Sequence, residues 1–145
     1  MSNYIRYKKG YKYQLVADYS VWIPITPMYP AGAGALVSPS GYMSINTGGL
    51  LSINKGYAWD GPSGPSIDTP DFMRGSLVHD ALYQLMREGV LSITRRNEVD
   101  LLLREMCRED GMSWIRSEVM YWAVHTFAGK AAGKGSIRKT YEAPE

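Results

Sequence analysis

The residues best suited to chemistry in this sequence lie in the stretch WDGPSGPSIDTPDFMRGSLVHDALY, residues 59–83. His79 and Asp80 are adjacent, and Tyr83 follows His79 by about one helical turn. Residues four apart share a face of a helix, so His79 and Tyr83 should point together, while Asp80 points about 100° away. This arrangement predicts two separate tasks, with His79 as a general base and Asp80 holding a cation beside it.

A second acidic residue, Asp100, lies in the mostly apolar row NEVDLLLREM. An isolated carboxylate is costly to bury, and a histidine on a facing helix is a natural partner for it. Asp100 would accept the imidazole N–H of His79 and leave the other ring nitrogen free to take a proton from water. Tyr83 could donate a hydrogen bond to the same carboxylate.

The glycine- and proline-rich loop before this helix could complete a metal site. Asp80 offers a carboxylate, and the backbone of residues 59–64 can fold back and offer carbonyl oxygens. Calcium takes several oxygen ligands, including backbone carbonyls, at roughly 2.3–2.6 Å. A cation there would polarise a carbonyl group and stabilise the oxyanion that forms when water attacks it.

The first half of the chain, residues 1–58, has the pattern of a small antiparallel sheet. Residues 11–25 mix aromatic and β-branched residues with partial alternation, which predicts β structure. Residues 42–54 predict a hairpin around Thr47-Gly48-Gly49, and KGYAWDG predicts a last short strand. The glycine-rich stretch AGAGALVSPSG, residues 31–41, predicts either a loop or a weak edge strand.

The second half, residues 69–129, predicts three helices. The first has Thr69 as N-cap and Pro70 at its first position, and it ends at Gly89. The second is expected to begin at a Thr94 cap and to close near Gly111. The third is expected to begin at Ser113 and to run through the apolar residues Trp114, Ile115, Val119, Trp122, Ala123 and Phe127. The predicted class is therefore α+β, a small antiparallel sheet followed by a three-helix unit.

Length and composition fit a single domain over residues 1–145, with a loop at 59–68 and a basic flexible tail at 130–145. The lone cysteine, Cys107, excludes an internal disulfide and a cysteine-based zinc cluster. The net charge of +2 is too small to indicate a nucleic-acid partner. No signal peptide or membrane span is expected, which points to a host cytoplasm or a virion, and self-association is left open.

The ordered set W-D-G-P-S-G, then H-D-A-L-Y, then an aspartate 21 residues after the histidine resembles secreted phospholipases A₂. It is most similar to the disulfide-free versions in parvovirus capsids. The resemblance covers residues 59–104 and implies that His79 is the base that activates water. It also implies that Asp100 orients His79 and that Tyr83 supports this contact.

The same resemblance implies a calcium site. Asp80 would be its side-chain ligand, and Trp59, Gly61 and Ser63 would donate carbonyl oxygens. Gly61 would also offer its N–H to the oxyanion. Trp59 stands where those enzymes have a tyrosine, and the β-rich first half is no part of their small helical fold.

Most of the chain also resembles an uncharacterised family of small phage and prophage proteins, a domain of unknown function. The resemblance rests on the β-rich first half, HDALY and the later N-E-x-D helix, and it implies a phage origin without an activity. Phospholipid, phage structural proteins or a host protein are then the candidate partners.

Other interpretations remain open. The set of His79, Asp80 and Asp100 could be a buried polar network that fixes two helices without chemistry, or another kind of ligand site. His125 is expected to be a core or partly buried residue. The stripe of Trp114, Trp122 and Phe127 is expected to be core or, beside the basic tail, a lipid-facing edge. The protein could then be a metal-assisted hydrolase, a virion or tail component, or a binder of a host factor.

Overall fold

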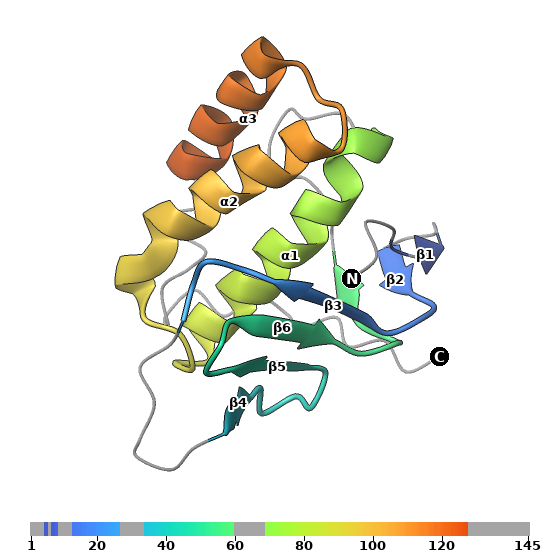
Figure 1. Ribbon diagram of the computed structural model, residues 1–145, viewed down its shortest axis with the longest axis vertical. Helices are drawn as coiled ribbons and strands as arrows, with labels where there is room; N and C mark the ends of the chain where they lie inside the picture. The colour runs from blue at the N-terminus through green and yellow to red at the C-terminus, as the bar shows by residue number, and fades with distance from the viewer. Residues whose placement is uncertain (1–4, 6, 9–12, 27–33, 60–68, 128–145) are drawn as a thin grey trace.

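The computed structural model describes residues 5, 7–8, 13–26, 34–59 and 69–127. Strands occupy the first half of this part of the chain and helices the second, as Figure 1 shows. The predicted α+β class is therefore confirmed. The predicted tail at 130–145, and the predicted loop apart from Trp59, lie outside the described residues.

The strands form two small antiparallel sheets. The four-stranded sheet has the order β3-β6-β5-β4, and the three-stranded sheet has the order β1-β2-β7. The strand bounds are β1 Tyr7–Lys8, β2 Tyr13–Leu15, β3 Tyr19–Trp22, β4 Ala35–Val37, β5 Met43–Asn46, β6 Leu50–Ile53 and β7 Ala58–Trp59.

The hairpin of β5 and β6 is confirmed, with Ile45 opposite Leu51. Buried and partly exposed residues alternate along both strands, as the two faces of a half-buried sheet require. The turn is closed by the Asn46 side chain, whose Oδ1 accepts hydrogen bonds from the N–H groups of Gly48 and Leu50, each at 2.9 Å. Gly49 has a φ of +91°, and a Cβ there would lie 2.5 Å from the carbonyl oxygen of Ile23, so only glycine fits.

The predicted β segment at residues 11–25 divides into two strands that join different sheets. β2 pairs with β1 and β7, whereas β3 pairs with β6. The break lies at the bend between them, where the carboxylate of Asp18 accepts the backbone N–H of Lys55 at 2.7 Å. Residues 31–41 supply β4, the edge strand of the larger sheet, as one of the two expectations had it.

The first helix, α1, runs over Pro70–Arg87 and is buried on most of its surface. Thr69 is its N-cap, as predicted, but its hydroxyl makes no capping bond and donates instead to the Asp71 carboxylate. Gly89, with a φ of +76°, follows the end of the helix as predicted.

The second helix, α2, runs over Arg96–Glu109 and begins later than predicted. A short 3₁₀ turn, Ile93–Arg95, precedes it, and Ser92 caps that turn by accepting the N–H of Thr94. The expected Thr94 cap is therefore wrong, because the serine two residues earlier accepts the orphan N–H. Gly111 follows α2 with a φ of +101°, which agrees with the predicted end.

The third helix, α3, runs over Trp114–Phe127 and begins as predicted, since the Ser113 hydroxyl accepts the N–H of Arg116 at 3.2 Å. Of the two expectations for Trp114 and Trp122, the core position is wrong, because both side chains are exposed. Ile115 and Val119 are exposed beside them. The buried face consists of Ser117, Met120, Tyr121 and Val124. Apolar residues occur on both faces of this helix, so their spacing could not indicate which one meets α2.

The helices lie in the order α1, α2, α3, with α3 on the far side of α2 from α1 (Figure 1). One hydrophobic core joins both sheets to α1 and α2, with Leu15, Ile45 and Ile53 from the strands and Leu77, Leu82 and Leu103 from the helices. No helix in the described part of the chain has the length and apolar character that crossing a membrane requires.

Gly75 is the point of closest approach between α1 and α2. A Cβ at this position would lie 2.9 Å from Leu103 Cδ1 and 3.2 Å from Cys107 Sγ. Replacing Gly75 with leucine should lower the free energy of unfolding by about 2 kcal/mol, because an overpacked core must shift backbone or side chains. Urea unfolding measures this. The control is Gly34→Leu, since an added Cβ at Gly34 meets nothing within 4 Å, and equal losses in both variants would refute the close contact.

Candidate active site

The carboxylate of Asp100 lies at the junction of all three helices and has no exposed surface. Its Oδ1 accepts hydrogen bonds from two residues of α1, Nε2 of His79 at 2.7 Å and the Tyr83 hydroxyl at 2.5 Å. Its Oδ2 lies 2.9 Å from Nδ1 of His125 on α3 and 3.7 Å from Nη1 of Arg96 on α2. A buried carboxylate is therefore surrounded by donors, as burial of an acid requires.

The structure brings His79, Tyr83 and Asp100 together as the sequence predicted. The rings of His79 and Tyr83 stack, with centroids 4.2 Å apart, because the two residues lie one turn apart on α1. With Asp100 ionised, the proton on Nε2 of His79 is the one that bonds to it, which fixes the tautomer of a neutral imidazole. Nδ1 then carries the lone pair.

Asp80 lies on the Nδ1 side of His79, with its Oδ1 3.7 Å from that nitrogen. Its side chain is 24% exposed, against 7% for His79, so Asp80 is the more solvent-accessible of the two groups. A partly exposed carboxylate next to an imidazole nitrogen can hold a cation or a water molecule close to the base.

The charges of this cluster stabilise one another. Burial by itself would lower the pKa of His79, but the hydrogen bond with Asp100 and the negative charges of Asp100 and Asp80 raise the pKa above its ordinary value. Burial would raise the pKa of Asp100, but its hydrogen bonds with His79, Tyr83 and His125 and the His79 charge lower it. Burial, followed by Asp100, raises the pKa of the Tyr83 hydroxyl, so Tyr83 serves as a donor.

The proposed calcium ligands are only partly within the described residues. Trp59, on β7, is buried, and its indole N–H donates to the Ser76 hydroxyl at 3.1 Å, one turn before His79 on α1. The start of the loop is thereby attached to α1, while Gly61 and Ser63 lie outside the described residues.

The donor set suits a hard cation to a limited extent. Asp80 supplies one accessible carboxylate of the kind that calcium binds. No three His, Cys, Asp or Glu side chains within the described ranges come together to hold a metal ion. A calcium ion beside Asp80 would therefore take most of its oxygen ligands from backbone carbonyls, which the resemblance assigns to the loop.

His125 and Arg96 are parts of the site that the sequence interpretation missed. His125 was expected to be a core or partly buried residue, and its side chain is 26% exposed. Its backbone carbonyl accepts Arg96 Nη1 at 2.7 Å, so the two residues hold each other beside Asp100. One signal was present, because Tyr121 and His125 are spaced like His79 and Tyr83, in reverse order, and also stack.

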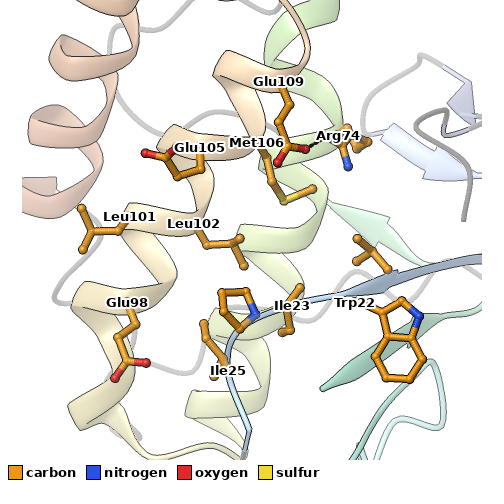
Figure 2. A pocket seen from close by; sticks show the side chains of 12 residues that line it. Trp22, Ile23, Ile25, Arg74, Glu98, Leu101, Leu102, Glu105, Met106 and Glu109 are labelled. Carbon is orange, nitrogen blue, oxygen red and sulfur yellow. Dashed lines mark hydrogen bonds and ion pairs between the residues drawn. The ribbon is translucent and has the colours of Figure 1, made fainter. Parts of the chain in front are cut away.

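A separate hollow of about 520 Å³ lies between α2 and the chain around β3, away from the Asp100 cluster. Figure 2 shows its apolar wall, with Trp22, Ile23 and Ile25 on one side and Leu101 and Leu102 on the other. The helical face that lines it is roughly opposite Asp100 on α2, since residues two apart on a helix point about 200° from each other. Its lining includes neither His79 nor Asp100.

A second buried charge joins α1 to the end of α2. Arg74, only 4% exposed, donates to the carboxylates of Asp110 and Glu109 and to the hydroxyl of Tyr19. Nothing in the sequence pattern of α1 predicted this residue, since arginine is rarely buried without partners. The Arg74 cluster ties both helices to β3, whereas the Asp100 network ties them to α3.

A model of the family described as "protein of unknown function (DUF1353)" matches residues 35–124. The chain belongs to this family. The match spans most of the described strands and helices and includes His79, Asp80, Tyr83 and Asp100, but it stops one residue short of His125. No curated protein and no solved structure has a significant similarity to this DUF1353 chain. The expected resemblance to a domain of unknown function is thereby confirmed, and the family assigns no activity.

Replacing Asp100 with asparagine should lower the free energy of unfolding by about 3 kcal/mol, because it leaves buried donors without a charged acceptor. Urea unfolding near neutral pH measures this. The control is Glu105→Gln, an exposed carboxylate on the same helix, which should change stability by less than about 0.5 kcal/mol. Similar losses in the two variants would show that the Asp100 contacts do not hold the helices together.

The pKa shifts also predict how stability depends on pH. The pKa of His79 is raised from 6.5, so its contribution is complete below 6.5 and is lost as pH rises through the higher, folded value. The pKa of Asp100 is lowered from 3.8, so its contribution is present above 3.8 and is lost as pH falls through the lower, folded value. The free energy of unfolding, measured in urea with chelator present, should therefore be greatest between pH 3.8 and pH 6.5. His79→Gln should remove the alkaline decline, and an unchanged decline would contradict the assignment.

Proposed function

We propose that this protein is a calcium-dependent hydrolase of lipid or other carboxylic esters, with His79 as its general base. The observation that carries the proposal is the contact of His79 Nε2 with the fully buried Asp100 carboxylate. A histidine held by an acid through one nitrogen, with the other nitrogen beside the more exposed Asp80, is the arrangement that water activation needs. The resemblance of the HDALY and loop motifs to phospholipases A₂ points to the same chemistry.

The reaction follows from the tautomer of His79. Nδ1 takes a proton from a water molecule, and the resulting hydroxide adds to the carbonyl carbon of the ester. Asp100 stabilises the imidazolium that forms, because it is ionised and already bonded to Nε2–H. When the tetrahedral intermediate collapses, the bond to the leaving alkoxide breaks, and His79 returns the proton to that oxygen. The products are a carboxylic acid and an alcohol.

Calcium, when bound, would polarise the ester carbonyl and stabilise the negative charge that develops on its oxygen. Asp80 would hold it, with the carbonyls of Trp59, Gly61 and Ser63, and the N–H of Gly61 would bind the same oxyanion. Tyr83 and His125 act on the other side of the imidazole, where they keep Asp100 ionised and in place. His79 and Asp80 thus face the substrate, while the other three position the base.

A phage origin and a role in the host cytoplasm or the virion belong to this proposal, since they rest on the resemblance to phage proteins. The second candidate is a non-enzymatic virion or tail component, or a binder of a host factor. The observation that favours it is the set of exposed apolar side chains on α3 and at Trp22, which suits contact with another surface. In that case the Asp100 network only joins the helices.

The proposal is tested by measuring release of fatty acid from phosphatidylglycerol vesicles, and of p-nitrophenol from p-nitrophenyl butyrate, with calcium or chelator. His79→Gln should lower kcat/KM by about a hundredfold or more, since a general base contributes at least that much. Asp80→Asn should remove the stimulation by calcium.

Glu105→Gln is the matched control and should hydrolyse both esters like the wild type, because its carboxylate is exposed on the surface of α2. Thermal melting of each variant separates a lost base from a lost fold. Absence of hydrolysis in the wild type with calcium, or equal rates for the wild type and His79→Gln, would leave the non-enzymatic candidate.

A further inference from the structure

The outer face of α3 exposes four large apolar side chains. Trp114 is 66% exposed, Ile115 72%, Val119 65% and Trp122 59%. Their spacing of one, four and three residues keeps them within less than half a turn of the helix surface. Single exposed apolar side chains are ordinary on proteins, whereas four on one helix face, with the partly exposed Glu118 among them, mark a surface that meets something apolar.

The same helix is also apolar on the face that packs against α2, where Met120, Tyr121 and Val124 are buried. A helix with apolar residues on opposite faces is typical of a helix covered on both sides. Among the described elements, α2 packs along α3, and Figure 1 shows α3 as the outermost helix. The start of α1 reaches α3 through Asp71, which pairs with Arg116. The outer face therefore lacks a counterpart within the described residues.

The chemistry of this face suits the boundary of a bilayer. Tryptophan combines a large apolar ring with an N–H that stays hydrated, which places it at the level of lipid headgroups. The guanidinium of Arg108 lies 5.3 Å from the centroid of the Trp114 ring and is partly exposed. A cation beside a headgroup-level indole is well placed for lipid phosphate, although Arg108 is also bonded to Glu118 within the protein.

The charge that selects the partner comes from the sequence directly after α3. Helix α3 ends at Phe127, and the next basic residues are Lys130, Lys134, Arg138 and Lys139. The two acidic residues of this segment, Glu142 and Glu145, come only after them. Basic residues adjoining an exposed apolar helix face add attraction to anionic lipid, at about 1 kcal/mol each near the surface.

We propose that the outer face of α3, together with the basic residues that follow it, docks this protein on an anionic phospholipid bilayer. A second copy of the chain could cover the apolar residues, but the four basic residues that follow α3 in the sequence favour an anionic partner. An anionic bilayer engages both features.

The docking face adjoins the candidate active site. The indole of Trp122 meets the ring of His125 edge-on, with centroids 6.1 Å apart, and His125 contacts Asp100. A bilayer against α3 would thus lie beside the Asp100 end of this network, on the other side of the imidazole from Nδ1 and Asp80. The docking proposal therefore goes beyond the proposed function and does not depend on it. Docking itself can be measured without hydrolysis.

The experiment is co-sedimentation in chelator with vesicles of phosphatidylcholine alone or of equimolar phosphatidylcholine and phosphatidylglycerol. The wild type should bind the anionic vesicles. The double variant Trp114→Gln, Trp122→Gln should bind at least about tenfold more weakly, because it lacks the two indoles that would be buried in the bilayer interface. Replacing Lys130, Lys134, Arg138 and Lys139 with glutamine should weaken binding to anionic vesicles by about tenfold or more.

Trp22→Gln is the matched control. It makes the same chemical change at an indole that is 56% exposed on β3, outside α3, and it should leave binding unchanged. The Trp22→Gln protein also permits a second measurement, since its fluorescence then comes from Trp114, Trp122 and the buried Trp59. Brominated lipid in anionic vesicles should quench that fluorescence, which tests docking without altering α3.

The outcomes separate this proposal from the hydrolase. Binding without any hydrolysis supports docking and rejects the enzyme. Hydrolysis of p-nitrophenyl butyrate without vesicle binding or quenching rejects docking and keeps the enzyme. A wild type that is dimeric by light scattering, with a monomeric double variant and no binding to vesicles, would assign the face to a second copy and overturn the proposal.

Discussion

The buried carboxylate of Asp100 is the interaction on which the helical half depends. It receives donors from α1 and α3 while lying on α2, so one group sets how three helices meet. Leaving such a charge without partners in the interior would cost several kcal/mol, which restricts the arrangements available to the helices. The same requirement fixes the orientation of the His79 ring. A histidine that satisfies a buried acid through one nitrogen has its tautomer fixed and its other nitrogen available.

Structural and catalytic roles of this network are therefore compatible. The contacts that stabilise an ionised Asp100 are also those that would stabilise an imidazolium during ester hydrolysis. A catalytic site would differ from a purely structural network at the surface in front of His79 Nδ1, where Asp80 is the accessible group. Trp59 ties the start of the preceding loop to Ser76 on α1, so the loop begins one turn from His79.

Helix α3 serves two neighbours with its two faces. Its inner face closes the Asp100 network through His125, while its outer face presents tryptophans to the surroundings. Trp122 touches both environments, because its ring is exposed and its edge meets His125. The separate hollow beside β3 lies away from Asp100, and the Arg74 cluster next to it stabilises the contact between the sheets and the helices.

The sequence by itself determined the α+β class, the hairpin at residues 42–54 and the meeting of His79, Tyr83 and Asp100. These features follow from local spacing, turn chemistry and the need to pair a buried acid, which act over short stretches or one pair of adjacent helices. Tertiary structure alone decided the split of residues 11–25 between two sheets, the orientation of α3 and the arrival of His125 at Asp100. A helix that is apolar on both faces has no preferred side until a neighbour is in place. Contacts between elements far apart in the chain have no characteristic residue spacing in the sequence. For that reason the sequence could not decide whether Trp114 and Trp122 of α3 lie in the core or at the surface.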